Sequence, residues 1–235
     1  MINKTLSINT QIDQIYHVSD VHIRNLIRHD EYKLVFNNLF DEIKKNTKNT
    51  LICVSGDIAH AKTDISPELI NMMNYFFSSL ADIAPTIVIT GNHDCNLNNT
   101  TRLDTLSPIL ELMNHPNLHY LKDTGVYTVN NIDFVVFSVF DVNTIDLSQL
   151  ITYCNPNHIK IALYHGLVNG ATTDKGFSID DFFINTQTFD GFDYAFLGDI
   201  HKLQVLQLQS YYDAIEIDEV DLDDYIKKGY EIIIE

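Results

Sequence analysis

The sequence of 235 residues contains only three cysteines, which are far apart: Cys53, Cys95 and Cys154. An odd number without close pairs does not build the disulfide framework of a small secreted domain. Residues 1–13 lack the basic start and apolar stretch of a signal peptide, and no window is apolar for long enough to cross a bilayer. These absences predict a soluble, intracellular protein of a reducing compartment, without a membrane partner.

Basic residues are also scarce. Fifteen Lys and Arg face 32 Asp and Glu, which gives a formal net charge of −17 at pH 7. Such a surface repels phosphates, so it argues against non-specific binding to nucleic acid. Bound cations would weaken that argument, because two divalent ions of +2 each would change −17 to −13 and reverse the potential locally. Net charge therefore does not exclude a substrate that contains phosphate.

A regular alternation of strand-like and helical segments occupies residues 12–114. Hydrophobic residues make up 45% of the chain and charged residues 20%, which suits one folded domain with a large core. The expected order is strand 12–19, helix 29–46, strand 51–54, helix 66–81, strand 86–90 and helix 101–114. This alternation predicts a parallel sheet covered by helices.

Two of these helices carry clear signals. The apolar face expected for the first one consists of Leu34, Val35, Asn38, Leu39 and Ile43. The second is expected to begin with Ser66 as its cap and Pro67 at its first position. Residues 72–80 of that helix are so apolar that part of them is expected to form a homodimer surface.

The pattern of expected elements changes after residue 118, where strands follow one another without long helices between them. Strands are expected at 118–121, 125–129, 132–140, 159–164, 194–197 and 232–234. The pair Asn130-Asn131 favours a tight hairpin, so a second, more antiparallel layer is predicted. An acidic run occupies residues 213–224.

Polar side chains follow five of the expected strands, and Gly91 is expected to end its strand by a turn that only glycine can make. The clusters are Asp20 with His22, Asp57, Asn92 with His93 and Asp94, His165, and Asp199 with His201. Because parallel strands end along one edge of a sheet, these clusters are expected to meet in one crevice.

Carboxylate, imidazole and amide ligands together suit Mn²⁺, Fe²⁺ or Zn²⁺, and the set is large enough for two ions with Asp57 as a plausible bridge. Two such metals would promote attack on a phosphorus centre. His93 needs no metal role, and it could protonate the leaving oxygen while Asp94 fixes its tautomer.

Five blocks in this order resemble the signature of the calcineurin-like metallophosphoesterases: Asp20-x-His22, Gly56-Asp57, Gly91-Asn92-His93-Asp94, His165-Gly166 and Gly198-x-x-His201. The resemblance covers residues 14–202 and implies a four-layer α/β sandwich, with two mixed sheets face to face and helices outside. The ligands that it implies are Asp20, His22 and His201 for the first metal, Asp57 as the bridge, and Asn92 and His165 for the second. It makes His93 the catalytic histidine and Asp94 its partner.

The amino-acid sequence at residues 56–60, 92–97 and 197–202 is most similar to that of DNA repair exonucleases of the SbcD type, including phage and large-virus versions. This similarity implies exonuclease or endonuclease activity on DNA with Mn²⁺, a role in repair or recombination, and a coiled-coil ATPase partner of the SbcC type. It also implies the cytoplasm of a bacterium or of a virus-infected cell. Fe²⁺, Zn²⁺ and Mg²⁺ remain alternative metals.

Two departures from that pattern matter. The last block usually has histidine at the position of Asp199, so an additional carboxylate is expected at the second metal. After His201 the pattern ends, which predicts a phosphoesterase domain at 1–202 and an acidic extension at 203–235. That extension is either the end of the same domain or the remnant of a missing cap.

Two other functions compete with DNA cleavage. A metallophosphatase acting on small or protein-bound phosphates would suit the acidic surface, and an inactive scaffold of the same fold would bind a partner without cleaving anything. Arg24 and His60 are candidate substrate contacts, although a solvated loop explains each of them equally well.

Overall fold

The computed structural model describes residues 2–62, 64–99, 101–173, 175–180, 184–202, 204 and 206, and the backbone of residues 231–233. The acidic run at 213–224 lies outside these residues. The division of the chain at residue 202 stays a prediction.

The first sheet contains the strands expected at the start of the chain. Its strands are β2 (Gln14–Val18), β3 (Thr50–Ser55), β4 (Thr86–Ile89), β5 (Leu118–Tyr120) and β10 (Glu231–Ile233), in the order β10-β2-β3-β4-β5. The pairs from β2 to β5 are parallel, and β10 is antiparallel to β2. The assignment of 118–121 to the second layer was therefore wrong, because the chain crosses over through α3 and adds β5 beside β4.

The second sheet is also mainly parallel. Its strands are β1 (Ile2–Thr5), β6 (Gly125–Val129), β7 (Ile132–Phe137), β8 (Ile159–His165) and β9 (Tyr194–Gly198), in the order β1-β6-β7-β8-β9. Only β6 and β7 pair antiparallel, through the predicted turn at Asn130-Asn131, where Asn130 has φ +52°. The hairpin is confirmed, whereas the antiparallel character of the layer is wrong. Strand β1 had not been predicted.

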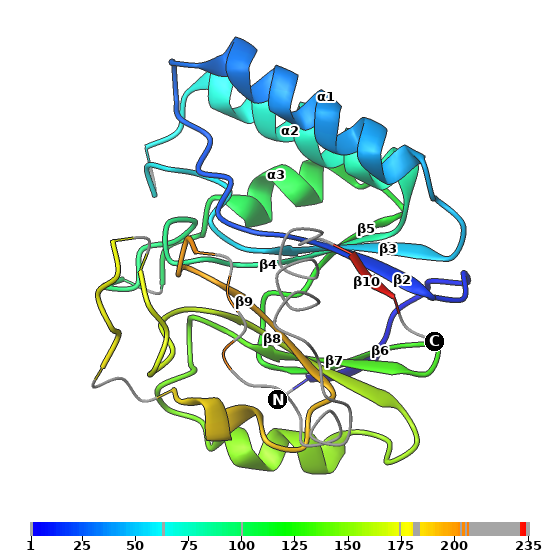
Figure 1. The fold of residues 1–235 in the computed structure, drawn as a ribbon. Helices are drawn as coiled ribbons and strands as arrows, with labels where there is room; N and C mark the ends of the chain where they lie inside the picture. The colour runs from blue at the N-terminus through cyan, green and yellow to red at the C-terminus, as the bar shows by residue number, and fades with distance from the viewer. Residues whose placement is uncertain are drawn as a thin grey trace.

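Helices α1 (His29–Lys44), α2 (Pro67–Ile83) and α3 (Leu106–Met113) cover the outer face of the first sheet (Figure 1). The predicted cap is confirmed, because the Ser66 hydroxyl accepts a hydrogen bond from Leu69 N–H at 3.1 Å. Helix α3 begins later than expected, since the buried Asp104 carboxylate accepts the Ser107 N–H and keeps the preceding residues in a loop.

The inward face of α1 differs from the predicted one. Phe36, Phe40 and Ile43 are buried, while Leu34 and Val35 are 64% and 61% exposed. The aromatic row buries more apolar area, so it decides how the helix is rotated. On α2, the apolar residues of 72–80 pack within the chain against α1 and the sheet, so a partner is not needed to explain them. The homodimer stays a prediction.

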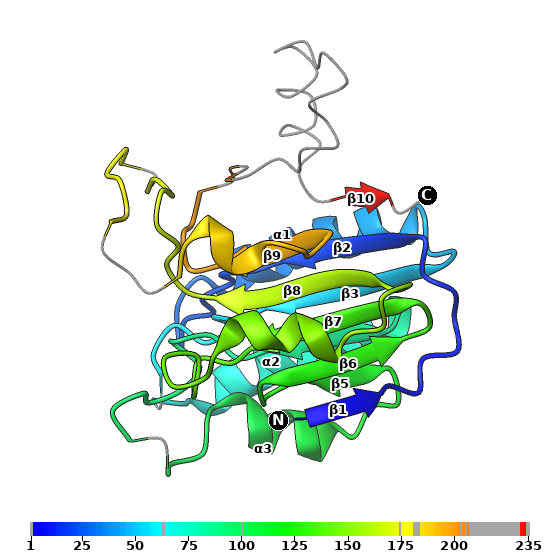
Figure 2. The ribbon, with the colours of Figure 1, turned by 90° about the horizontal axis from the view of Figure 1, so that it is seen from below.

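The short helices η1 (Leu147–Tyr153) and η2 (Thr186–Phe189) cover the outer face of the second sheet (Figure 2). Between the sheets lies a core to which Leu51 and Ile87 contribute from one side and Phe134 and Leu163 from the other. The predicted fold, two sheets face to face with helices outside, is confirmed. No helix among the described residues is long and apolar enough to cross a membrane.

Candidate metal centre

The predicted site residues lie at the carboxyl ends of strands from both sheets. They follow β2 (Asp20, His22), β3 (Asp57), β4 (Asn92, His93, Asp94) and β9 (Asp199, His201), or end β8 (His165). Two hydrogen bonds join the sheets here: His165 Nδ1 donates to the carbonyl of Ser55 at 2.6 Å, and Asp199 N–H donates to the Asp20 carboxylate at 3.0 Å. All of these residues therefore share one end of the sandwich.

Three of them form a compact first group. His22 Nε2 lies 3.0 Å from His201 Nε2, and Asp20 Oδ1 lies 3.4 Å from His201 Nε2 and 4.0 Å from His22 Nε2. One carboxylate oxygen and two imidazole nitrogens thus face a common centre, with all three ligand atoms within 4.8 Å of one another. This donor set suits a divalent transition metal.

A second group is formed around the buried Asp57. Its Oδ1 lies 3.3 Å from His165 Nε2, and its Oδ2 lies 3.6 Å from His22 Nε2 of the first group. Asp20 Oδ1 completes the second group at 4.0 Å from His165 Nε2. Because each oxygen of Asp57 faces a different group, its carboxylate lies where a bridging ligand is needed.

Asn92 and Asp199 lie on the side of His165. Asn92 Nδ2 donates to Asp199 Oδ1 at 2.9 Å, and this oxygen is 3.9 Å from His165 Nε2. The hydrogen bond holds the amide of Asn92 by its nitrogen and leaves the amide oxygen available as a ligand atom. The carboxylate at position 199 therefore both joins the group and orients its neighbour.

Unsatisfied atoms provide a test of whether this group fits metal ions. Among the described residues, five buried side-chain atoms have no hydrogen-bond partner, and two of them, Asp57 Oδ2 and His165 Nε2, face the candidate metal centre. A buried charged atom without a partner is costly, and a bound cation removes that cost. Donors, distances and unsatisfied atoms thus fit a pair of divalent cations.

The charges of the site reinforce one another. Burial alone would oppose ionisation of Asp57 and His165, but their mutual contact dominates. It lowers the pKa of Asp57 and raises the pKa of His165 to about 9. Burial raises the pKa of Asp199 above its ordinary value. The raised pKa of His165 shows that the carboxylates around it favour a positive charge at this position.

Backbone strain is concentrated at the same place. Five of the predicted ligands have a positive φ: Asp20 (58°), His22 (49°), Asp57 (55°), Asp199 (81°) and His201 (55°). A side chain in this region costs on the order of 1 kcal/mol, and such strain gathers at functional sites. The fold holds these side chains in place against a local preference.

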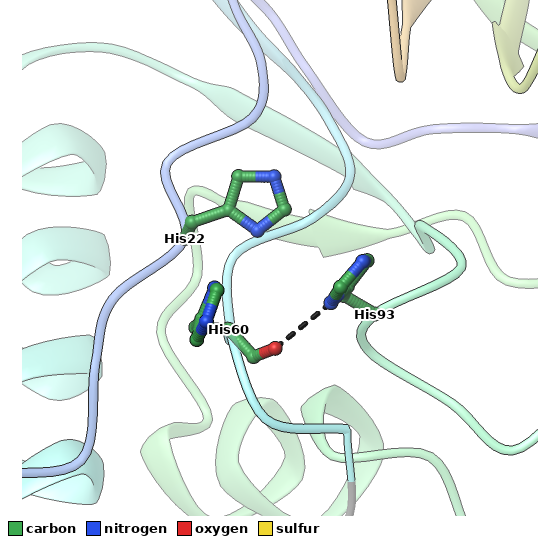
Figure 3. A group of neighbouring side chains, drawn as sticks. All are labelled: His22, His60 and His93. Carbon is green, nitrogen blue, oxygen red and sulfur yellow. Dashed lines mark hydrogen bonds between the residues drawn. The ribbon is translucent and has the colours of Figure 1, made fainter.

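The histidine next to the candidate metal centre, His93, has a different partner from the one predicted. His93 Nδ1 donates to the backbone carbonyl of His60 at 2.8 Å, as the dashed line in Figure 3 shows. A carbonyl only accepts, so it fixes the tautomer with the proton on Nδ1 and leaves Nε2 free. The expectation that Asp94 orients His93 is corrected by this geometry.

The buried Asp94 instead closes the loop that carries Asp57. Its Oδ2 accepts the N–H groups of Asp57 and Gly91 at 2.8 and 2.9 Å, and its Oδ1 accepts those of Ile58 and Ala59, both at 2.9 Å. Burial raises the pKa of Asp94 to about 7, while the backbone donors work in the opposite direction. Asp94 thus supports the site through the backbone.

Gly91 is required for a reason other than the predicted turn, because its φ is not positive. A Cβ atom there would lie 2.1 Å from Asp57 Oδ1 and 2.2 Å from Asp57 N. We expect Gly91→Ala to displace Asp57, to lower the free energy of unfolding by about 1–3 kcal/mol and to reduce the number of bound metals. Urea unfolding and elemental analysis measure the two effects.

Gly170→Ala is the matched control for this prediction. Gly170 has φ +89°, and no atom lies within 4 Å of the position that a Cβ atom would take, so substitution there strains only the backbone. It should lower stability by about 1 kcal/mol and leave metal content unchanged. Equal metal loss in both variants would contradict the steric argument.

The candidate substrate contacts lie beside the cluster. A pocket of about 320 Å³ is lined by His22, Arg24, Arg28, Tyr32, His60, His93 and His201. Three of these residues, His22, His60 and His93, lie together and bring a ligand nitrogen each within 4.8 Å of one another (Figure 3). Sequence reasoning had missed Arg28 and Tyr32, whose only signal is their place after the first block. A larger hollow of about 680 Å³ between α1 and α2 contains none of the predicted ligands.

A two-sheet sandwich with acids and imidazoles gathered at one end is the architecture that the resemblance to metallophosphoesterases implied. Residues 14–203 match the family described as calcineurin-like phosphoesterase, and the chain belongs to this family. The family depends on a pair of metal ions, which agrees with the candidate centre found here.

The chain is similar in sequence to a viral protein and in structure to a bacterial nuclease. The chain is 45% identical over 205 residues to "Uncharacterized protein R555" of Acanthamoeba polyphaga mimivirus, which covers 84% of this chain and 15% of that protein. The chain thus spans about 15% of the length of this relative. The Pseudomonas putida nuclease MPE has a crystal structure with 13% identity and a TM-score of 0.37, covering 70% of this chain and 66% of that one. That likeness is too low to bear on function.

Proposed function

We propose that this protein hydrolyses phosphodiester bonds of DNA with two divalent cations, Mn²⁺ being favoured. The observation that carries the proposal is the position of Asp57, whose two oxygens face imidazoles of two different ligand groups, His165 and His22. A bridging carboxylate between two ligand groups is the arrangement that two-metal phosphoryl chemistry requires. In this proposal Asp20, His22 and His201 hold one ion, and Asn92, His165 and Asp199 hold the other.

The cations would supply Lewis acidity that polarises the phosphate and acidifies a water molecule. The chain's own contribution is positional. His93, held by the His60 carbonyl, lines the pocket, and its imidazolium form can give the Nε2 proton to the leaving oxygen and return to the neutral tautomer with the proton on Nδ1. The strained loops that carry the ligands, and the hydrogen bonds from backbone N–H groups to Asp94, keep the ligand carboxylates in place before substrate arrives.

A direct assay tests the proposal. The protein is incubated with Mn²⁺ and labelled single-stranded or duplex DNA, and separately with bis(p-nitrophenyl) phosphate and p-nitrophenyl phosphate. We expect cleavage of DNA and of the diester. Cleavage of the monoester alone would support the competing metallophosphatase, which the net charge of −17 favours. No turnover of any substrate would identify a scaffold.

The finer part of the proposal concerns the cellular role. The motif text that resembles SbcD-type exonucleases supports a function in DNA repair or recombination, together with a coiled-coil ATPase partner. Co-expression with candidate ATPases and recovery of a stable complex on gel filtration would support that partnership, and DNA cleavage that is independent of any ATPase would argue against it.

The carboxylate at position 199 should set the metal preference. A carboxylate is a harder ligand than imidazole, so it favours Mn²⁺ and Mg²⁺ relative to Zn²⁺. We expect Asp199→His to raise the ratio of bound Zn²⁺ to bound Mn²⁺ by about tenfold, as a ligand change of roughly 1.4 kcal/mol would do. Competition dialysis followed by elemental analysis measures this ratio.

The matched control for this prediction is Asp41→His. Asp41 lies on the surface of α1, with its side chain 76% exposed. The substitution therefore introduces a histidine away from the site. It should leave the ratio at the wild-type value. If Asp199→His behaves like this control, the carboxylate does not act on the metal.

A further inference from the structure

The arginines of this chain are unevenly placed. The sequence contains only three, Arg24, Arg28 and Arg102, in a protein of net charge −17. Two of the three, Arg24 and Arg28, line the pocket of about 320 Å³ beside the candidate metal centre. Four of the ten histidines line the same pocket. A strongly acidic protein thus gathers its guanidinium groups at one place.

The backbone that carries these arginines is firmly attached to the site. Ile23 N–H donates to the carbonyl of Ile58 at 2.7 Å, and His60 N–H donates to the carbonyl of Ile23 at 3.0 Å. Tyr32 donates its hydroxyl proton to the carbonyl of His22 at 2.6 Å. The segment of residues 23–32, which carries both arginines, is therefore fixed relative to the loop after β3, which carries Asp57.

Their side chains are available for a ligand. Among the residues that the structure describes, Arg24 has no carboxylate partner. Arg28 pairs with Glu31 at 2.5 Å, but both side chains are more than 60% exposed. Such a surface pair contributes little free energy, so a stronger anion can replace Glu31. Guanidinium groups bind phosphate by two parallel hydrogen bonds, which makes phosphate the matching ligand.

We propose that Arg24 and Arg28 form a second phosphate subsite, which binds the phosphate next to the one that is cleaved. The inference rests on the proposed cleavage of DNA and names the residues that bind the neighbouring phosphate of that substrate. A substrate with successive phosphodiesters, an oligonucleotide, fills both the metal centre and this subsite. An isolated phosphate ester fills only the first. The subsite also explains how so acidic a protein binds a polyanion.

The test compares Arg24→Gln/Arg28→Gln with Arg102→Gln, which removes the arginine outside the pocket. KM and kcat are measured with Mn²⁺ on a short oligothymidylate and on bis(p-nitrophenyl) phosphate, which has no neighbouring phosphate. In the double variant we expect the KM for the oligonucleotide to rise about tenfold more than the KM for the small diester. Arg102→Gln should change neither the KM for the oligonucleotide nor the KM for the small diester.

A binding experiment separates this inference from the proposed function. The affinity for a labelled oligothymidylate is measured by fluorescence anisotropy at several salt concentrations, with and without Arg24→Gln/Arg28→Gln. Both proteins also carry His93→Ala, which prevents cleavage, unless the wild type hydrolyses nothing. Compared with the protein that keeps both arginines, the double arginine variant loses one phosphate contact, which should reduce the slope of log affinity against log salt by about 0.7. An unchanged slope, equal effects on both substrates, or no oligonucleotide binding by the wild type would each overturn the subsite. If the wild type hydrolyses nothing but the double arginine variant still has a smaller salt slope, the hydrolytic function is wrong and the phosphate subsite stands.

Discussion

His93→Ala should lower kcat on a phosphodiester by about 10²–10⁴-fold, the usual contribution of a positioned general acid. The reason is that the His60 carbonyl holds the Nδ1 proton of His93, so the imidazolium form of His93 can give its Nε2 proton to the leaving oxygen next to the candidate metal centre. Bound metal, measured by elemental analysis, should stay at the wild-type level because His93 is not one of the proposed ligands. A stopped assay with bis(p-nitrophenyl) phosphate and Mn²⁺ measures the rate.

His115→Ala is the matched control for this substitution. His115 precedes β5 and pairs with Asp82 at 3.2 Å, so it lies at the amino-terminal edge of the sheet, opposite to the site. It should leave kcat and metal content unchanged. Should His93→Ala lose a metal ion, His93 is a ligand and its assignment as an acid is wrong.

Asp94→Asn should be the most destabilising conservative change at this end of the molecule. Asp94 accepts four backbone N–H groups, and an amide accepts with one oxygen only while its NH₂ faces the other two donors. Leaving two buried donors unsatisfied should lower the free energy of unfolding by about 3 kcal/mol or more. Urea unfolding monitored by circular dichroism gives this value.

Asp146→Asn is the control, since Asp146 also accepts a backbone N–H, from Ser148 at 3.2 Å, but at an exposed position. Water replaces the lost bonds there, so the effect should stay below about 1 kcal/mol. The Asp94 variant should also bind less metal, because the loop that it closes carries Asp57. Wild-type stability in Asp94→Asn would mean that the carboxylate is not the acceptor of this loop.

The predicted elements succeeded where local sequence signals are strong. Ser66 and Pro67 define the start of α2, and the β-branched run at 86–89 forms β4 as expected. Predictions failed where long-range packing decides. The strand at 118–120 has no signal that tells which sheet it joins, and the rotation of α1 depends on whether Phe36 or Leu34 finds a partner across the core.

The candidate site shows the same division. Its ligand residues follow strands, and parallel strands end at one edge, so their meeting was expected from the order of elements. The partner of His93 was not, because it is a backbone carbonyl, and every residue offers one. Gly91 was correctly singled out for the wrong reason, since the close approach of Asp57 from another strand leaves no trace in the local sequence.

The sequence by itself determined the family, the alternation of strands and helices, and the set of acids and imidazoles that can hold two cations. Only the tertiary structure decided which of these groups face one another, that Asp94 closes a backbone loop, and that two of three arginines lie beside the centre. The physical reason is that residue type and spacing fix local conformation and ligand chemistry, whereas hydrogen-bond partners and charge neighbours come from segments far apart in the chain.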